Sequence, residues 1–409
     1  MVTRRYAVNL IYNGVQATSE ISPYLNSFTY TDALDESDTV SLNLTDREGR
    51  WAAGWIPQKE DRLSAEIVTE NWNGGKEQKR ISCGDFMVDD FRFSGPPDML
   101  SISGISSPLN LDFKETRRYK TWAEATLFQI ASEISGRYGL ECVFEGADIP
   151  ILKAEQSGQA DGDFLKKTAQ KYGFGMKTYS GRIILFEYAL YESKAAEKII
   201  RKSDVRKWDY KSTMLGTYTG AKVSYTNPGT KETVEILVGK EGRLYKTNEK
   251  ADNMADAERI GQNALRNANR KETTFSACML PVTELYAGEN VNLSGFGKMD
   301  GRYQIGKVLH QVGTGDYSLQ ISGWRLPEEA ADEPKEDGQG TAGQGTYVVQ
   351  SGDTLWELSE RFYGSPELYG RLYQANREVI DREAKRRGKA DSRNGYWIFP
   401  GTELEIPEG

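Results

Sequence analysis

The stretch "QSGQADGDFLKKTAQKYGFGMKTYSGRIILFE", residues 156–187, contains a helix pattern followed directly by a hairpin pattern. In its first half apolar side chains recur at helical spacing, and Asp161 or Asp163 stands where a capping residue is favoured. The residues expected on the inward face of this helix are Phe164, Leu165, Thr168 and Tyr172. The second half alternates about Ser180-Gly181, which is typical of a tight β-turn. The stretch therefore predicts a helix and a hairpin packed together as an α/β unit.

Another helix is predicted a short distance upstream, in "TWAEATLFQIASEISGRYGL", residues 121–140. Thr121 and Glu124 have the spacing of a capping box, and Gly139 stands where helices commonly end. The inward face of this helix is expected to consist of Leu127, Ile130 and Ile134. The two helices and their strands together predict an α/β insertion over residues 116–200.

Both sides of this insertion have the pattern of β-structure. Residues 1–115 alternate apolar and polar side chains in short runs separated by Gly, Pro and Asn, and residues 201–326 do the same around one helix near residues 253–270. The 22 Tyr and 41 Gly of the chain also favour strands and tight turns. The predicted fold class is therefore mainly β with an α/β insertion (α+β), in which two β-barrel-like domains flank the insertion.

A linker and a small module are expected after the second β domain. Apolar residues nearly vanish over residues 327–345, so this segment is predicted to be a flexible linker. The module over residues 346–409 begins with "YVVQSGDTLWELSERFYG", which predicts a strand, a turn and a helix with a Thr354/Glu357 capping box. The inward face of that helix is expected to hold Leu355, Leu358 and Phe362. A second helix ending at Asn376 and a last strand in "WIFPGTELEIP" complete a βααβ order.

The charge of the chain argues against a nucleic-acid partner. Its 52 Lys and Arg residues are outnumbered by 60 Asp and Glu residues, which gives a formal net charge of −8, whereas nucleic-acid-binding proteins present a basic surface. The compact basic cluster from Arg382 to Lys389 alternates with acids and predicts a solvated helix end. The N-terminal residues contain no apolar run of the length that a signal peptide or membrane span requires, so synthesis in the bacterial cytoplasm is expected.

Patterns of metal binding and of histidine catalysis are weak. Cys83, Cys142 and Cys278 are far apart and predict reduced thiols rather than a disulfide or a zinc site. His310 is the sole histidine and lies within a predicted strand, where a packed histidine is more common than a general base or a metal ligand. We therefore expect no metal and no cofactor.

Acidic pairs and glycine loops give no stronger signal of an enzyme. The acidic pairs that stand close in sequence are Asp161/Asp163 and Asp89/Asp90. The first is expected to cap a helix and the second to lie beside a strand. "SGFGKMDG" is not followed by the helix that a phosphate-binding loop needs, so Gly295 and Gly297 are expected in a turn. No enzymatic activity is predicted.

Four segments of the first 326 residues carry a family resemblance in their order along the chain. They are "FSGPPDMLSISGISS", "ETRRYKTWAEATLFQIASEISGRYGL", "AEQSGQADGDFLKKTAQKYGFGMKTYSGRIILF" and "GENVNLSGFGKMDGRYQIGKVLHQVGTGDYSLQISG". In this order they resemble the tail-hub proteins of contractile phages, the late control protein D family, and the related spike proteins of type VI secretion. The third segment is the most specific, since a Gln, a short polar stretch, an Asp, "FL" and a "YGF" ending recur in these hubs.

This resemblance implies an assembly as well as a fold. It implies two barrel-like domains with pseudo-twofold repetition, and a homotrimer that forms a ring of near-sixfold symmetry. Such a ring adapts a six-fold tube to a three-fold spike. The implied partners are a tail tube or tube-initiator protein, a separate spike protein and baseplate wedge proteins. The implied location is the baseplate of a phage tail or phage-like injection particle.

The C-terminal module, residues 346–407, resembles the LysM domain, with a longer and more charged segment, "REVIDREAKRRGKADSRNGY", before its last strand. In glycan-binding members of that family the sugar groove lies between the loop after the first strand and the loop before the last. The positions that correspond are Gly352, Asp353, Thr354, Leu355, Ile398, Phe399, Pro400 and Gly401. Their backbone groups suit N-acetyl groups of peptidoglycan. The same residues serve equally as turn and core residues, or as a clamp on baseplate proteins.

Three classes of function follow from these patterns. The leading one is a structural tail hub whose LysM module binds baseplate neighbours or peptidoglycan. The lack of a catalytic constellation opposes a peptidoglycan-targeted cell-wall hydrolase, and the lack of a sorting segment opposes a wall adhesin. Electron microscopy of particles that co-purify with the protein discriminates among these classes.

Overall fold

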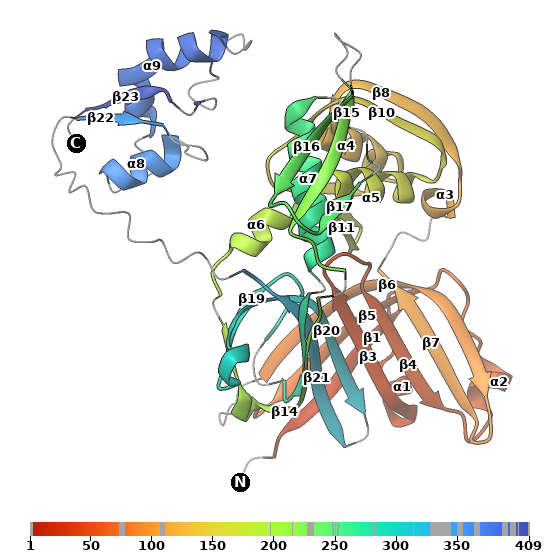
Figure 1. Ribbon diagram of the computed structural model, residues 1–409. Coiled ribbons are helices and arrows are strands. Elements are labelled where there is room, and N and C mark those ends of the chain that lie inside the picture. The colour runs from red at the N-terminus through yellow and green to blue at the C-terminus, as the bar shows by residue number, and fades with distance from the viewer. Residues whose placement is uncertain are drawn as a thin grey trace. The chain divides into compact units, whose positions relative to one another are not determined.

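The computed structural model describes residues 3–72, 78–106, 111–196, 198–214, 216–226, 233–247, 249, 251, 253–270, 272–281, 284–313, 315–327, 345–349, 355–363, 369–386, 392, 398–399 and 401–407. The chain divides into two compact units, Met1–Glu328 and Glu329–Gly409 (Figure 1). Each unit has a hydrophobic core of its own.

The first unit is built on a sheet that comprises 13 strands among the described residues. Its main path runs in the order β14-β18-β21-β20-β3-β4-β7-β6-β5-β1-β2, and β19 and β13 are attached beside β20. The strands from the N-terminal region are β1 Arg5–Tyr12, β2 Val15–Gln16, β3 Leu25–Ala33, β4 Thr39–Thr45, β5 Arg62–Glu70, β6 Gln78–Ser94 and β7 Met99–Ile105. The strands from the C-terminal region are β13 Lys198–Arg201, β14 Val205–Ser212, β18 Thr273–Met279, β19 Asn290–Ser294, β20 Gly301–Gly313 and β21 Asp316–Arg325.

Alternation along the strands places one face of this sheet on a core. In β4, for example, Val40, Leu42 and Leu44 are buried and their neighbours are not, because successive side chains of a strand point to opposite faces. Short helical segments accompany the sheet: α1 Thr18–Ile21, η1 Ser22–Tyr24, α2 Arg50–Gly54, η2 Lys202–Asp204 and η3 Gly297–Met299. The fold is mainly β, as the sequence predicts.

Strand β20 joins the N-terminal and C-terminal regions into one sheet. On one side it pairs with β21, and on the other it pairs first with β19 and then, over residues 307–313, with β3. Val312 and Tyr317, near the tip of the β20–β21 hairpin, belong to the same core as the N-terminal strands. The described strands form no closed barrel. The barrel-like arrangement and the domain boundaries given above remain predictions.

The α/β region lies above this sheet in Figure 1. Its elements are α3 Leu111–Lys114, β8 Arg118–Thr126, α4 Leu127–Arg137, β9 Glu141–Glu145, β10 Pro150–Gln159, α5 Asp161–Lys171, β11 Phe174–Tyr179, β12 Arg182–Glu187 and α6 Tyr188–Ser193. Strands β8 and β10 form a two-stranded ribbon, and β11, β12 and β9 form a three-stranded sheet. The hairpin turn at Ser180-Gly181 is confirmed, with φ of 44° and 76° at the two residues, the left-handed values that a type I′ turn needs.

The predicted start of helix α4 is wrong, because the helix is capped by Thr126 and not by Thr121. Thr121 lies within β8, and the capping box is formed by Thr126 and Gln129. The Gln129 backbone N–H donates to the Thr126 hydroxyl at 3.2 Å, and the Thr126 N–H donates to the Gln129 side chain at 3.0 Å. The inward residues Leu127, Ile130 and Ile134 are buried, as predicted.

Strands β15 to β17 stand apart from the large sheet. Among the described residues, strands β15 Gly220–Thr226, β16 Thr233–Gly239 and β17 Leu244–Lys246 pair with one another and not with the large sheet. Helix α7 Met254–Asn269, predicted near residues 253–270, packs Ala257 and Ile260 against Val223 of this sheet. The side chain of Asn253 caps α7, since its oxygen accepts the Asp256 N–H at 2.9 Å.

The second unit has the predicted βααβ order. Its elements are β22 Gly345–Val348, α8 Leu355–Tyr363, α9 Tyr369–Arg386 and β23 Glu403–Ile406. Strands β22 and β23 pair antiparallel. Leu355 and Leu358 are buried and Phe362 packs against the same core, as predicted. None of the helices described in either unit has the length and apolar character that a membrane crossing requires.

Candidate functional site

In the second unit, the backbone of Val349, just after β22, is hydrogen-bonded to Gly401 and Thr402, just before β23. The Gly401 N–H donates to the Val349 carbonyl at 2.8 Å, and the Val349 N–H donates to the Thr402 carbonyl at 2.8 Å. Val349 therefore lies beside the turn that precedes β23. Gly352, Asp353, Thr354 and Pro400 lie outside the described residues.

The predicted groove residues that the structure describes have identifiable structural roles. Leu355 is buried in the core, and Ile398 packs against that core. The Phe399 carbonyl accepts the Thr402 N–H at 3.1 Å, which closes a turn. Gly401 is exposed with φ of 88°, a left-handed conformation that favours glycine. Their part in a sugar groove or a protein contact remains a prediction.

Asn376 does not end the second helix of this unit. Helix α9 continues to Arg386, because Ile380 and Ala384 extend its buried stripe by two further steps of four residues. The side chain of Asn376 is buried and faces β23: its Nδ2 donates to the Glu405 carbonyl at 2.7 Å, and its Oδ1 accepts the Glu405 N–H at 2.6 Å. The residue therefore fastens the helix to the last strand.

The C-terminal end of α9 carries charged residues, and part of the following segment is attached to it. Arg382, Lys385 and Arg386 are exposed on its last turn, whereas residues 387–389 of the predicted basic cluster lie outside the described residues. Ser392, from the charged segment that follows, is fully buried and donates its hydroxyl to Asp381. Hydrogen bonds from Ser392 lower the pKa of Asp381 below its ordinary value. The charged segment is thus attached to the helix at this point.

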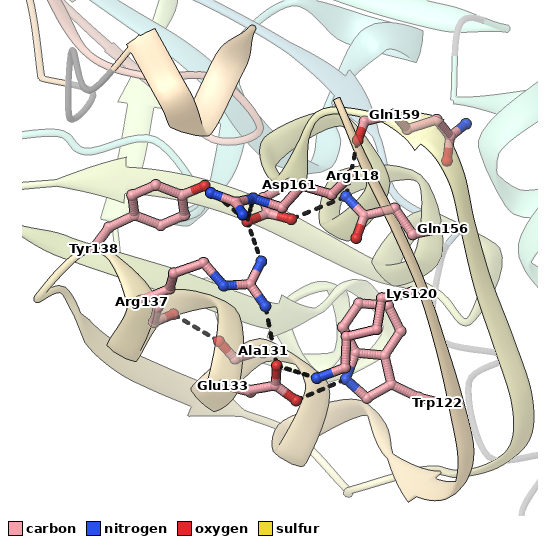
Figure 2. Close-up of polar contacts among 11 residues, drawn as sticks. Arg118, Lys120, Trp122, Ala131, Glu133, Arg137, Tyr138, Gln156, Gln159 and Asp161 are labelled. Carbon is pink, nitrogen blue, oxygen red and sulfur yellow. Dashed lines mark hydrogen bonds and ion pairs between the residues drawn. The ribbon is translucent and has the colours of Figure 1, made fainter. Parts of the chain in front are cut away.

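In the first unit, Asp161, from the stretch of residues 156–187, lies at the centre of a buried ionic cluster (Figure 2). The residue is the first of α5, but its side chain makes no cap; the N-cap position is Ala160. The Asp161 carboxylate is fully buried and accepts hydrogen bonds from the Tyr138 hydroxyl at 2.7 Å and the Gln156 amide at 2.9 Å. The prediction that Asp161 caps the helix is therefore wrong, since both oxygens are used by residues of other elements.

Two guanidinium groups complete the Asp161 cluster. Arg137 of α4 donates to the carboxylate, and the Nε atom of Arg118 in β8 lies 3.2 Å from it. Burial alone would raise the pKa of Asp161, but hydrogen bonds from Gln156, Tyr138 and Arg137 lower it below its ordinary value. The cluster ties together α4, α5, β8 and β10, as Figure 2 shows.

A second carboxylate extends this cluster along β8. Glu133 of α4 pairs with Arg137 at 3.0 Å and with Lys120, and it accepts the indole N–H of Trp122 at 2.9 Å. The Trp122 ring in turn stacks on Phe164 of α5, with ring centroids 5.0 Å apart. Polar and aromatic contacts thus hold the β8–β10 ribbon against both helices.

A second buried ionic group joins the α/β region to the large sheet. The ammonium of Lys177 in β11 lies between the carboxylates of Asp32 and Asp38, with 2.8 Å to Asp38. Asp38 also accepts the hydroxyl of Tyr30 at 3.0 Å, and Asp32 accepts the Ala287 N–H at 2.8 Å. Burial and the neighbouring Asp32 raise the pKa of Asp38 to about 6, although Lys177 opposes the shift. Sequence reasoning missed this group, because its members belong to different predicted domains.

His310 lies on β20 next to this group, as predicted for a packed strand histidine. Its Nδ1 is 2.8 Å from the Tyr317 hydroxyl, and its ring stacks on Tyr30 with centroids 5.6 Å apart. Burial lowers the pKa of His310 to about 4. The imidazole is therefore neutral near pH 7, held by one hydrogen bond and two aromatic neighbours.

The remaining residues selected from the sequence are not brought together. Asp163, Asp89 and Asp90 are exposed, and Asp300 accepts the backbone N–H groups of Gly295 and Phe296 in a turn. The three cysteines are free thiols. Within the described ranges, His, Cys, Asp and Glu form no group of three or more with the geometry of a metal site.

Comparisons with known proteins match both units. Residues 347–381 match the LysM domain family. The "Probable baseplate hub protein" of Escherichia phage 186 is 25% identical over 229 residues, which cover 54% of this chain and 56% of that protein. The protein of the same name in Escherichia phage P2 is 27% identical over 226 residues, 53% of this chain and 55% of that protein.

The chain resembles a phage tail hub with a C-terminal LysM domain. It spans about half the length of the curated hub proteins it matches. The fold of the hub unit is also that of a solved structure, the 43 kDa tail protein of prophage MuSo2 from Shewanella oneidensis. The two agree with a TM-score of 0.59 at 15% identity, over 79% of this chain and 99% of that one.

Proposed function

We propose that this protein is a structural hub in the baseplate of a contractile phage tail or a phage-like injection particle. The observation that carries the proposal is the pairing of β3 with β20, which makes one continuous sheet from two sequence regions. A fused sheet suits a rigid building block, because its strands cannot move apart without breaking many backbone hydrogen bonds. The buried Lys177 group adds a fixed attachment for the α/β region. The similarity to phage baseplate hub proteins supports the same role.

The proposed assembly is a homotrimer that adapts a six-fold tube to a three-fold spike. Two β regions per chain, repeated in three chains, supply six similar contacts on one side and three on the other. The proposed neighbours are a tail tube or tube-initiator protein, a separate spike protein and baseplate wedge proteins. The protein is proposed to be made in the bacterial cytoplasm and built into the particle there.

The LysM unit is proposed to contact neighbouring baseplate proteins through the exposed end of α9. Its charged side chains suit a polar contact between subunits and are poorly suited to a sugar groove. Peptidoglycan is the alternative ligand, favoured by the LysM match at residues 347–381. The groove candidates are then the positions predicted from the sequence, Gly352, Asp353, Thr354, Leu355, Ile398, Phe399, Pro400 and Gly401.

No catalytic role is proposed. The curated relatives named above carry the name "Probable baseplate hub protein", and the buried acids Asp32, Asp38 and Asp161 and His310 make hydrogen bonds within the fold. The alternative of a cell-wall hydrolase is tested by incubating the purified full chain with cell walls. Release of reducing sugars or free amino groups above a heat-inactivated control would support it.

The proposed function is tested on particles made in cells that carry a tagged full-length chain. We expect the tag to co-purify with tail-like particles and to lie at the baseplate in electron micrographs. The mass of the protein mixed with its spike partner is expected to be that of a trimer. A chain that stays monomeric in that mixture and is missing from the particles would contradict the proposal.

A further inference from the structure

Strand β14, Val205–Ser212, ends the path of the large sheet on one side. Among the described residues its one strand partner is β18, so the backbone N–H and C=O groups along its other edge have no strand beside them. Six of its eight side chains are exposed. Strand β14 is therefore an open edge, of the kind to which an extended segment of another chain can add.

The opposite edge of the large sheet, at β1, is covered by the chain itself. Strand β2 pairs with the end of β1, and the Leu10 N–H donates to the Thr18 hydroxyl at 2.8 Å. Near the start of β1, the indole N–H of Trp72 donates to the Arg5 carbonyl at 2.8 Å. Folded proteins commonly cover their sheet edges in this way. The contrast shows that the edge of β14 is left open while the other edge of the same sheet is closed.

The segment that contains the open edge is basic. Residues 201–211, "RKSDVRKWDYK", hold five Lys and Arg residues and two Asp residues, a net charge of +3 within a chain of net charge −8. Lys207 and Lys211 are exposed, and neither forms an ion pair with the part of the chain that the structure describes. They share one face of the strand with Asp209, because alternate residues point to the same side. The edge therefore favours a partner that carries carboxylates.

The other face of β14 carries an aromatic ring that the fold covers only in part. Trp208 lies opposite Ala277 of β18, which lies opposite Ile321 of β21, and both of these partners are buried. The Trp208 ring contacts Phe296, with ring centroids 5.5 Å apart, yet it remains 40% exposed. An added strand would place a side chain beside this ring. An apolar residue there would extend the buried row and remove apolar surface from water.

The two faces of β14 define the sequence of a segment that fits its edge. Apolar residues fit opposite Trp208 and Tyr210, since both side chains lie on the face that packs on the core. Acidic residues fit opposite Lys207 and Lys211, and a neutral polar residue fits opposite Asp209. The resulting pattern is acidic, apolar, polar, apolar, acidic. It is the same in both directions, so it suits a parallel or an antiparallel strand.

We propose that β14 binds an extended acidic segment of a partner protein by strand addition. Backbone hydrogen bonds along the edge hold the segment, an apolar side chain covers Trp208, and carboxylates pair with Lys207 and Lys211. This inference goes beyond the proposed hub function, because a single copy of the chain presents the edge. A second copy of the chain is a poorer occupant, since two β14 strands side by side would bring like charges together. Lysines on an edge thus discourage self-pairing and select an acidic partner.

The test uses the full-length chain and a fluorescent peptide with the core sequence Glu-Val-Thr-Val-Glu. We expect fluorescence anisotropy to show that the peptide binds, and we expect slower hydrogen exchange at the β14 amides that point away from β18. The variant with Lys207→Glu and Lys211→Glu should bind the peptide about tenfold or more weakly, because two attractive charge pairs become repulsive. The matched control, Lys59→Glu with Lys167→Glu, makes the same change of net charge at exposed sites elsewhere and should bind as the wild type does.

Two N-methylated forms of the peptide separate strand addition from attraction between charges alone. Backbone N–H groups of successive residues in a strand point to opposite edges. Methyl groups on the two Val nitrogens therefore block one edge of the peptide, and methyl groups on the nitrogens of Thr and the last Glu block the other. Both forms keep the charge and the side chains of the parent peptide. We expect one form to bind about tenfold or more weakly than the parent and the other form to bind as the parent does.

Several outcomes would overturn the proposal. Equal binding by the two methylated forms would leave only attraction between charges, and a parent peptide that does not bind would leave no recognition at all. The same holds if the β14 amides exchange as fast with the peptide as without it. Protection of these amides in the chain alone, at concentrations where it self-associates, would assign the edge to a second copy. None of these results bears on the proposed hub function, because the experiment involves no particle.

Discussion

The sequence predicts a capping role for Asp161, whereas the structure shows its side chain in a buried ionic cluster. An acid at the start of a helix is a favoured cap, but the N-cap of α5 is Ala160, and Asp161 is the first residue of the helix itself. Its role depends on Arg118, Arg137 and Tyr138, which reach it from β8 and the end of α4. Contacts between elements of this kind are not encoded in local spacing, so the sequence could not reveal them.

The first prediction distinguishes these two roles by Asp161→Asn. Asn is as good a helix cap as Asp, so a capping role predicts no loss of stability. Because the Asp161 carboxylate neutralises two guanidinium groups, we expect the variant to lower the free energy of unfolding by about 2–3 kcal/mol. Chemical denaturation of the full chain measures this. Asp163→Asn, an exposed acid on the same helix, is the control and should change stability by less than about 0.5 kcal/mol; equal effects of the two variants would contradict the assignment.

Lys177 forms the buried ion pairs that join the α/β region to the large sheet. Lys177→Met keeps most of the side-chain volume but leaves Asp32 and Asp38 facing each other without a cation. We expect a loss of about 3–5 kcal/mol, the cost typical of breaking a buried ion pair. Lys222→Met, which removes an exposed pair with Glu235, should cost less than about 1 kcal/mol. A shift in melting temperature no larger than that of the control would show that the joint does not depend on Lys177.

The pH dependence of stability should contain two opposing contributions from this region. Burial raises the pKa of Asp38 from 3.8 to about 6, so the folded state holds a proton that the unfolded state has lost, and stability falls as pH rises from about 4 to 6. Burial lowers the pKa of His310 from 6.5 to about 4, so the unfolded state holds the extra proton, and stability rises with pH over nearly the same window.

Each contribution amounts to about 3 kcal/mol, and the wild-type chain should therefore show little net change between pH 4 and 6.5 from these two groups. Asp38→Asn is expected to leave the histidine contribution, so that its stability rises with pH. His310→Gln is expected to leave the carboxyl contribution, so that its stability falls with pH. Melting temperatures at half-unit pH steps measure both slopes. Parallel pH profiles for the two variants would contradict the assignment.

At the scale of elements, strongly patterned segments were predictable and their ends were less so. The β11–β12 hairpin was predicted at its turn because Ser180-Gly181 adopts the left-handed values that such turns need. Helix α4 begins at Leu127 rather than near Thr121, because the preceding residues pair with β10 as a strand. Tertiary pairing overrode a local capping signal there. Helix α9 runs past Asn376, although the spacing of Ile380 and Ala384 was available to predict it.

Asn376 provides the test at this scale. Asn376→Ala removes an amide that bonds to both backbone groups of Glu405, and it leaves the N–H and C=O of that residue without these partners. We expect a loss of about 2–3 kcal/mol in the LysM unit and faster hydrogen exchange of the Glu405 amide. Arg377→Ala, at the exposed next position, is the control and should leave exchange unchanged. Unaltered protection of Glu405 in Asn376→Ala would show that the helix and strand are held by packing alone.

At the scale of the whole molecule, strand pairing between the ends of the hub unit was beyond sequence reasoning. The alternation of apolar and polar residues predicts that each strand is half-buried, but it does not predict which strand each one pairs with. The β3–β20 pairing thus emerges only when the strands are placed in order.

The division of the chain into two compact units allows the role of the LysM unit to be tested by its removal. A chain that ends at residue 330 keeps every core residue of the hub unit, so it should fold and trimerise. If the LysM unit contacts baseplate neighbours, we expect missing or unstable baseplates in micrographs of particles made with this chain. The full-length variant with Arg382, Lys385 and Arg386 changed to Glu should reproduce that defect, because it reverses the charge of the proposed contact on α9. Normal particles that fail only at the cell surface would assign the unit to peptidoglycan instead.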